Sequence, residues 1–203
     1  MKLDITKANS RSTRIPMKHL AIVTLMLNFG VAGIYAQPGP EKMTLSGTAA
    51  ASTISLHGTP ASEYHLAGTS RLGQVDVRVV SISTPSAQQP YACSGQTKLY
   101  GSAVAGAGVF SFENGGLLKV SLTGGSDCID LLAGEALCIR IFQITGGTGR
   151  FKNVSGGTIT LTMSVVPVLE DGPNNPVFFA VTGAITGTVP GLAADQRSED
   201  GQL

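Results

Sequence analysis

A turn built from glycines runs directly into an alternating segment, and this stretch constrains the fold more than any other part of the chain. Residues 146–151 read GGTGRF, and the segment that ends at Val166 then alternates apolar and hydroxyl-bearing side chains. The apolar set is Ile159, Leu161, Met163 and Val165, and the polar set is Thr158, Thr160, Thr162 and Ser164. Because successive side chains of a strand point to opposite faces, the pattern predicts a strand with one buried and one solvated face.

Most of the chain after Glu41 has the same character, with Thr, Val and Ile in short runs that glycines separate. We found no long window with the apolar spacing of an amphipathic helix. We predict strands at residues 43–49, 53–57, 74–82, 97–104, 109–113, 117–123, 136–145, 157–166 and 177–189. Glycines inside strands, such as Gly183 and Gly187, fit the bends of a closed barrel, so we predict an all-β antiparallel barrel.

The first 36 residues have the layout of a signal peptide, with basic residues followed by an uncharged apolar run from Leu20 to Ala36. That run is shorter than the roughly 20 residues that cross a bilayer, which disfavours an uncleaved anchor. The polar stretch before Met17 is long for a leader, so we predict that translation starts at Met17. We therefore expect a secreted or periplasmic protein without a membrane span in its mature chain, with a barrel domain at residues 37–190 and a frayed tail at residues 191–203.

Three cysteines, Cys93, Cys128 and Cys138, lie in the predicted mature chain, where an oxidising compartment lets disulfides form. Cys128 and Cys138 flank a short segment with a turn-like Ala133-Gly134 step. We predict that these two are paired across a hairpin and that Cys93 is a buried free thiol.

The GGTGRF motif, followed by Gly156 and an alternating strand, resembles the corresponding stretch of dirigent proteins and allene oxide cyclases. It is even more similar to a group of secreted bacterial proteins of unknown function with the pattern ITGGTGRF. The resemblance implies an eight-stranded antiparallel barrel, often with an apolar cavity, and dirigent proteins form trimers, so a homo-oligomer is one alternative. No pocket residue of those families aligns with this chain, and no catalytic role is carried over.

The residues of the motif themselves predict a structural turn. Gly146, Gly147 and Gly149 would supply positive φ values, and Phe151 would be an apolar plug behind them. An anion-binding nest of backbone amides, with Arg150 adding charge, is the weaker alternative because the motif lacks the Lys-Ser/Thr pair of a P-loop.

Polar chemistry is sparse in this chain. Asp127 and Asp130 lie near the cysteine segment, and with Arg140 they are the candidates for an acid–base or ligand-binding site. The alternative is that these acids only stabilise turns. His57 and His65, with Glu63 between them, lack the spacing of a metal site, so we interpret them as solvated loop residues.

We predict no catalytic residue, cofactor-binding residue, metal ligand or cofactor from this sequence. The absence of a basic patch and of tryptophan argues against nucleic-acid binding. Three hypotheses for function stay open. The first is a secreted non-catalytic barrel that binds a small hydrophobic ligand or a surface partner. The second is a cyclase- or dirigent-like enzyme whose cavity steers a hydrophobic substrate, and the third is a structural protein of the cell envelope or matrix.

Overall fold

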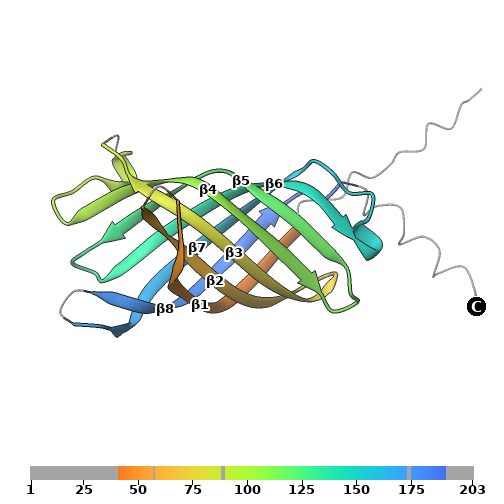
Figure 1. Ribbon diagram of the computed structural model, residues 1–203, viewed down its shortest axis with the longest axis horizontal. Coiled ribbons are helices and arrows are strands. Elements are labelled where there is room, and N and C mark those ends of the chain that lie inside the picture. Colours follow the sequence, from red (N-terminus) through yellow and green to blue (C-terminus); the bar gives the residue numbers. More distant parts are fainter. Residues whose placement is uncertain (1–40, 57, 88–89, 173–174, 191–203) are drawn as a thin grey trace, which may run out of the picture. The chain divides into compact units, whose positions relative to one another are not determined.

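The computed structural model describes residues 41–56, 58–87, 90–172 and 175–190. They form one closed sheet in which each strand is antiparallel to the next and the last pairs with the first (Figure 1). The strands are β1 (Glu41–Leu56), β2 (Thr59–Ser70), β3 (Gly73–Pro85), β4 (Lys98–Phe112), β5 (Leu117–Asp130), β6 (Glu135–Thr148), β7 (Thr158–Glu170) and β8 (Pro176–Gly187). Two short 3-10 helices, η1 (Tyr91–Cys93) and η2 (Gly149–Phe151), lie in the connections. The predicted all-β barrel is therefore confirmed.

Several strands differ from their predicted bounds. β1 joins the two segments predicted at 43–49 and 53–57, and β4 joins those predicted at 97–104 and 109–113. β2 was not predicted at all, because Pro60 and two histidines made residues 57–65 resemble a loop. The register of β4 shifts opposite Ile82 and Ser83, and this bulge explains how one strand contains the glycine-rich break that separates the two predictions.

One half of the barrel is filled by side chains. Apolar residues from every strand point inward there, and Phe110, Phe142, Leu161 and Met163 have no exposed surface. A cavity of about 10 Å³, lined by Met43 and Phe110 among others, is no larger than a water molecule needs. The predicted inward face of β7, Ile159 to Val165, is confirmed. In the described part of the chain, no helix has the length and apolarity needed to cross a membrane.

The GGTGRF stretch closes this half, and Phe151 is the predicted plug. The Phe151 ring is fully buried with its centroid 4.7 Å from that of Phe112, and the Arg150 guanidinium lies 5.0 Å from the Phe151 ring. Gly149 has a φ of +60°, which favours glycine. The expectation of a positive φ at Gly147 is wrong: this residue is in β6, and a Cβ there would lie 2.6 Å from the Cβ of Phe151. Gly147 therefore makes room for the plug.

Candidate functional site

The opposite end of the barrel is open. The β1–β2, β5–β6 and β7–β8 hairpins and the β3–β4 connection meet there, at the left of Figure 1. Leu99 on β4 pairs with Ile129 on β5. Each lies two residues beyond an inward-facing position, Gly101 on β4 and Asp127 on β5, so both side chains face the inside of the barrel. Leu99 is nevertheless 51% exposed and Ile129 39%. Phe112, inward-facing at the closed end of β4, is 4% exposed. We call this end the open mouth.

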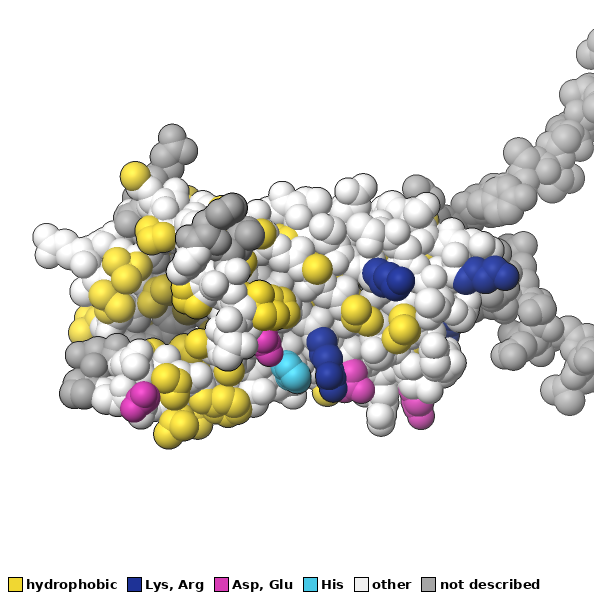
Figure 2. Space-filling model, in the orientation of Figure 1, with side chains coloured by type: hydrophobic (Ala, Val, Ile, Leu, Met, Phe, Trp, Pro, Cys, Tyr) yellow, Lys and Arg dark blue, Asp and Glu magenta, His cyan; other side chains and the backbone are white. Residues whose placement is uncertain are grey.

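Exposed apolar side chains surround the open mouth. We define them as the apolar rim: Leu99, Ile129, Leu131, Leu132, Val168 and Leu169. Leu132, at the tip of the β5–β6 hairpin, is 84% exposed. Figure 2 shows hydrophobic side chains gathered at this end of the barrel, around a recess between the hairpins. Such a concentration at one end is what binding surfaces present and what ordinary solvated surfaces avoid.

A buried ion pair forms the floor of the open mouth. Arg140 of β6 pairs in register with Gly125 of β5, and its guanidinium reaches Asp127, two residues nearer the mouth. The Arg140 Nη1–Asp127 Oδ1 distance is 2.7 Å and the Nη2–Oδ2 distance is 3.1 Å, so the contact is bidentate. The inward-facing Gly125 and Ala103 lack bulk at this level. These small residues leave the interior space that the long arginine side chain occupies.

Arg140 uses its donors on the protein. Its Nε donates to Ser81 Oγ at 2.9 Å, and its Nη2 donates to Tyr64 OH at 3.2 Å. Its Nη1 also donates to the Ile139 carbonyl oxygen at 3.0 Å. Each of the three guanidinium nitrogens thus has an acceptor within the barrel, which a buried guanidinium requires.

Each member of the ion pair keeps the other in its charged form. Burial alone would raise the pKa of Asp127, but the hydrogen bonds and charge of Arg140 outweigh it and the pKa is lowered. Arg140 stays protonated as well: burial opposes its charge, and the surrounding Tyr64 and Asp127 raise its pKa. The carboxylate side chain is 12% exposed and the guanidinium side chain 1%, so Asp127 is the member of the pair that solvent reaches.

Two neutral groups complete the cluster. Burial raises the pKa of Tyr64 to about 12, although the charge of Arg140 opposes the shift. Burial, reinforced by the Asp127 charge, also raises the pKa of the Cys138 thiol. Cys138 pairs with Asp127 across β5 and β6 and is a buried free thiol. At neutral pH the floor is therefore one ion pair among uncharged hydroxyl and thiol groups.

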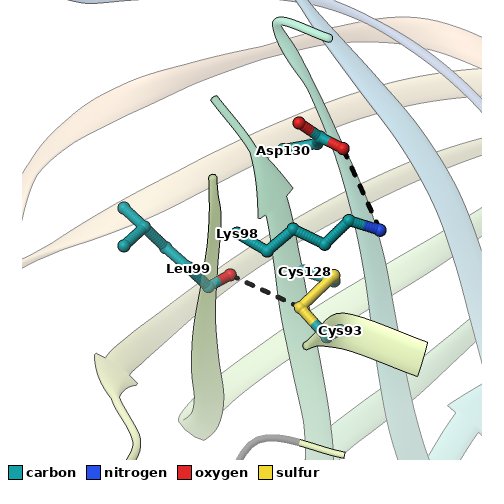
Figure 3. Close-up of a disulfide and its surroundings, with 5 residues drawn as sticks. All are labelled: Cys93, Lys98, Leu99, Cys128 and Asp130. Atoms are coloured by element: carbon teal, nitrogen blue, oxygen red, sulfur yellow. Dashed lines mark hydrogen bonds and ion pairs between the residues drawn. A yellow bond between two sulfur atoms is a disulfide. The ribbon is translucent and has the colours of Figure 1, made fainter. Parts of the chain in front are cut away.

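The predicted Cys128–Cys138 disulfide is wrong. The bond joins Cys93 to Cys128, with 5.6 Å between their Cα atoms, and fastens η1 to β5 (Figure 3). The side chains of Cys128 and Cys138 point to opposite faces of the sheet. Cys138 points inward, like its pairing partner Asp127, and Cys128, which follows Asp127 along β5, points outward. Because adjacent residues of a strand point to opposite faces, the two thiols of the predicted pair lie on opposite sides of the barrel wall.

The other polar candidates do not join the cluster. Asp130 accepts hydrogen bonds from the backbone N–H groups of Leu132 and Ala133 and lies 3.9 Å from Lys98 Nζ, so it stabilises a turn. His65 is exposed on β2, and Glu63 accepts a hydrogen bond from Ser52 on β1; both lie in a strand and not in the predicted loop. The prediction for His57 concerns a residue outside those described.

Sequence reasoning singled out Asp127 and Arg140 but missed Tyr64, Ser81 and Ser83. The signal was present in β3, where Ser81 and Ser83 continue the inward alternation of Val77 and Val79. Hydroxyl groups at positions where the pattern requires apolar residues mark a polar element in the core.

Comparison with family models, curated proteins and solved structures found no significant match for this chain.

Proposed function

We propose that this protein is a non-catalytic β-barrel that binds a small hydrophobic molecule in its open mouth. The observation that carries the proposal is the contrast between the two ends of one barrel: inward-facing side chains are buried at the plugged end and exposed at the open mouth. Binding sites for small molecules combine apolar walls with a few fixed polar groups. The apolar rim supplies the first, and the Arg140–Asp127 pair supplies the second.

An apolar occupant would remove the apolar surface of the rim from water. Burial of apolar surface contributes about 25 cal/mol per Å², so a rim with several half-exposed leucine, isoleucine and valine side chains favours an apolar occupant. The arginine and carboxylate below it need no ligand for their own hydrogen bonding, because each already has partners. An occupant therefore gains mainly from apolar contact and loses little by meeting the floor.

A neutral apolar dye tests this proposal. We expect Nile red to bind the barrel with a stoichiometry of one and to be displaced by small apolar molecules. Ile129→Ser, in the open mouth, should weaken binding several-fold, since it removes apolar contact. Ile141→Ser is the matched control: Ile141 lies on the outer face of β6 and is 37% exposed, against 39% for Ile129. Equal weakening by both substitutions, or no binding by the unaltered protein, would refute the proposal.

A second candidate is a cyclase- or dirigent-like enzyme, and the ionised Asp127 beside neutral Tyr64 favours it. An interior carboxylate and a hydroxyl are the groups that steer proton transfers in an apolar site. The discriminating measurement is chiral chromatography of the product when a phenol is coupled by a one-electron oxidant in the presence of the protein. An enantiomeric excess that Tyr64→Phe abolishes, with the Arg140–Asp127 pair left in place, would support the enzyme, whereas a racemic product would support the binding protein.

The envelope or matrix hypothesis has less support. Unpaired strand edges would favour it, and each strand of the described barrel is paired on both sides.

A further inference from the structure

We infer that the open mouth takes an amphiphile with a single polar head, and takes it tail first. The apolar end of the molecule lies against the floor, and its head stays in water at the level of the apolar rim. Molecules with a polar group at both ends are excluded. This inference rests on the proposed binding function and names the chemical class and the orientation of its ligand.

The polar groups of the floor are all used within the barrel. The Asp127 carboxylate accepts hydrogen bonds from the Cys138 thiol and the Ser83 hydroxyl. It also accepts two from Arg140, so its four lone-pair sites are occupied and its charge is neutralised. Arg140 in turn donates to Ser81 through Nε and to Ser83 through Nη2. In the part of the chain that the structure describes, every buried side-chain nitrogen and oxygen has a hydrogen-bond partner. The floor therefore offers a ligand no vacant donor or acceptor.

A polar end of a ligand would lose its water at this floor and gain no hydrogen bond in return. A hydroxyl that is desolvated without a replacement weakens binding by about tenfold or more, and an ionised group weakens it far more. A methyl end gives up no hydrogen bond when it leaves water. The apolar end is therefore the one that enters the mouth.

The rim is the level at which a polar head keeps its water. Leu99 and Ile129 face the inside of the barrel there and are still 51% and 39% exposed. Glu135, which begins β6, and Glu170, which ends β7, are exposed at the same end. A head at this level stays hydrated whatever its charge, so the charge of the head contributes little to affinity.

The distance from the floor to the rim sets the length of chain that the mouth can bury. Asp127 lies three residues before the end of β5 at Asp130, which is about 10 Å along the strand and roughly 8 Å along the axis of a barrel with tilted strands. Each methylene group that is buried raises affinity about fourfold, and a methylene beyond the rim stays in water. Affinity should therefore rise with chain length and then level off.

Four molecules with the same chain test the orientation by competition with Nile red. Octanol, octylamine and octanoate differ in the head, and 1,8-octanediol carries a second hydroxyl at the inner end. At neutral pH and high salt, which screens the acids of the rim, we expect the three single-headed molecules to displace the dye within about threefold of one another. Octanediol should be about tenfold weaker than octanol, or weaker still.

Octanediol equal to octanol overturns the inference, and so does a head-group effect of about tenfold or more. A dye that binds but yields to none of the four also overturns it. A dye that does not bind at all removes the proposed function itself.

A series of unbranched alcohols tests the depth of the mouth. From butanol to hexanol the affinity should rise about fourfold per methylene group, and from octanol to dodecanol it should level off. A rise that continues at the same rate through dodecanol would mean that the chain lies along an outer surface, and it would overturn the inference.

Two serines of β3 provide a matched pair of variants that leave the Arg140–Asp127 contact in place. Ser83 is half-buried and lies two residues nearer the mouth than Ser81, which is 2% exposed. Ser83→Ala frees an acceptor site of Asp127 on the side of the mouth, where the inner hydroxyl of octanediol can use it. The preference for octanol over octanediol should then fall several-fold, because the desolvated hydroxyl regains a partner.

Ser81→Ala is the control and should leave that preference unchanged, since the donor that it frees, Arg140 Nε, lies below the floor. Octanol itself should bind both variants as it binds the unaltered protein, which shows that both are folded. An unchanged preference in Ser83→Ala, or the same change in both variants, would contradict the closed floor.

Discussion

Arg140 and Asp127 lie on adjacent strands and meet inside the barrel through two parallel hydrogen bonds, at the level where the filled core gives way to the open mouth. The pair closes the apolar half on one side and forms the floor of the mouth on the other. Its position makes it a structural boundary as well as the polar part of the proposed site.

Loss of one member of the pair should be costly. Asp127→Leu or Arg140→Met leaves one buried charge without its partner, and we expect each to lower the free energy of unfolding by about 3–5 kcal/mol. The double variant should lose less than either single change, because neither charge then remains. Urea unfolding of the three variants gives the comparison, and single substitutions that cost less than about 1 kcal/mol would show that the pair is solvated.

Acid should remove the contribution of Asp127. Its pKa is lowered in the folded protein, so its stabilisation is present above the unfolded value of about 3.9 and is lost as the pH falls through the lower folded value. Unfolding free energies measured from about pH 5 downward should fall more steeply for the unaltered protein than for Asp127→Asn. Asp76→Asn, at an exposed position, should keep the steep dependence, and parallel curves for all three proteins would contradict this assignment.

Gly147 should tolerate no side chain. A Cβ would lie 2.6 Å from the Cβ and the carbonyl oxygen of Phe151, so Gly147→Ala must displace the plug, and we expect a loss of about 1–3 kcal/mol. Gly124→Ala on β5 is the matched control, because no atom lies within 4 Å of its added Cβ. Thermal unfolding separates them: the first should melt several degrees below the second, and equal melting temperatures would mean that Phe151 is not seated against Gly147.

The disulfide should be recovered as a Cys93–Cys128 peptide. It closes a loop of sequence separation 35, for which the chain-entropy model gives a stabilisation of about 4 kcal/mol. Peptide mapping without reduction should find this pair, with Cys138 alkylated only after unfolding because its thiol is buried. A Cys128–Cys138 peptide would reinstate the pairing that strand parity excludes.

The parts of this protein that are local in sequence were predictable. The alternation in β7 defined its buried face, and GGTGRF defined a turn with Phe151 behind it, because periodicity and turn chemistry involve neighbouring residues. The missed strand, β2, has Pro60 near its start, where proline is tolerated in a strand although its sequence signal is that of a loop.

The parts that depend on register were not predictable. Which cysteine can reach Cys128 depends on which residues of each strand point inward and which point outward. On β5 this assignment shifts at the bulges. The partners of Arg140 come from β2, β3 and β5, at separations of 13 to 76 residues, so only the closed barrel brings them together. Asp127 and Arg140 were identifiable as candidates, but their contact was not.

Occupation of the open mouth can be measured directly because the chain has no tryptophan. Ile129→Trp places a single indole in the mouth, and Ile141→Trp places one on the outer face of the wall at nearly the same exposure. Addition of decanol, a small apolar molecule, should shift the emission of the Ile129→Trp protein to shorter wavelength, saturably, and leave that of the Ile141→Trp protein unchanged. An unchanged spectrum from the mouth reporter, or the same shift from both, would contradict the claim that this barrel binds its ligand at the open end.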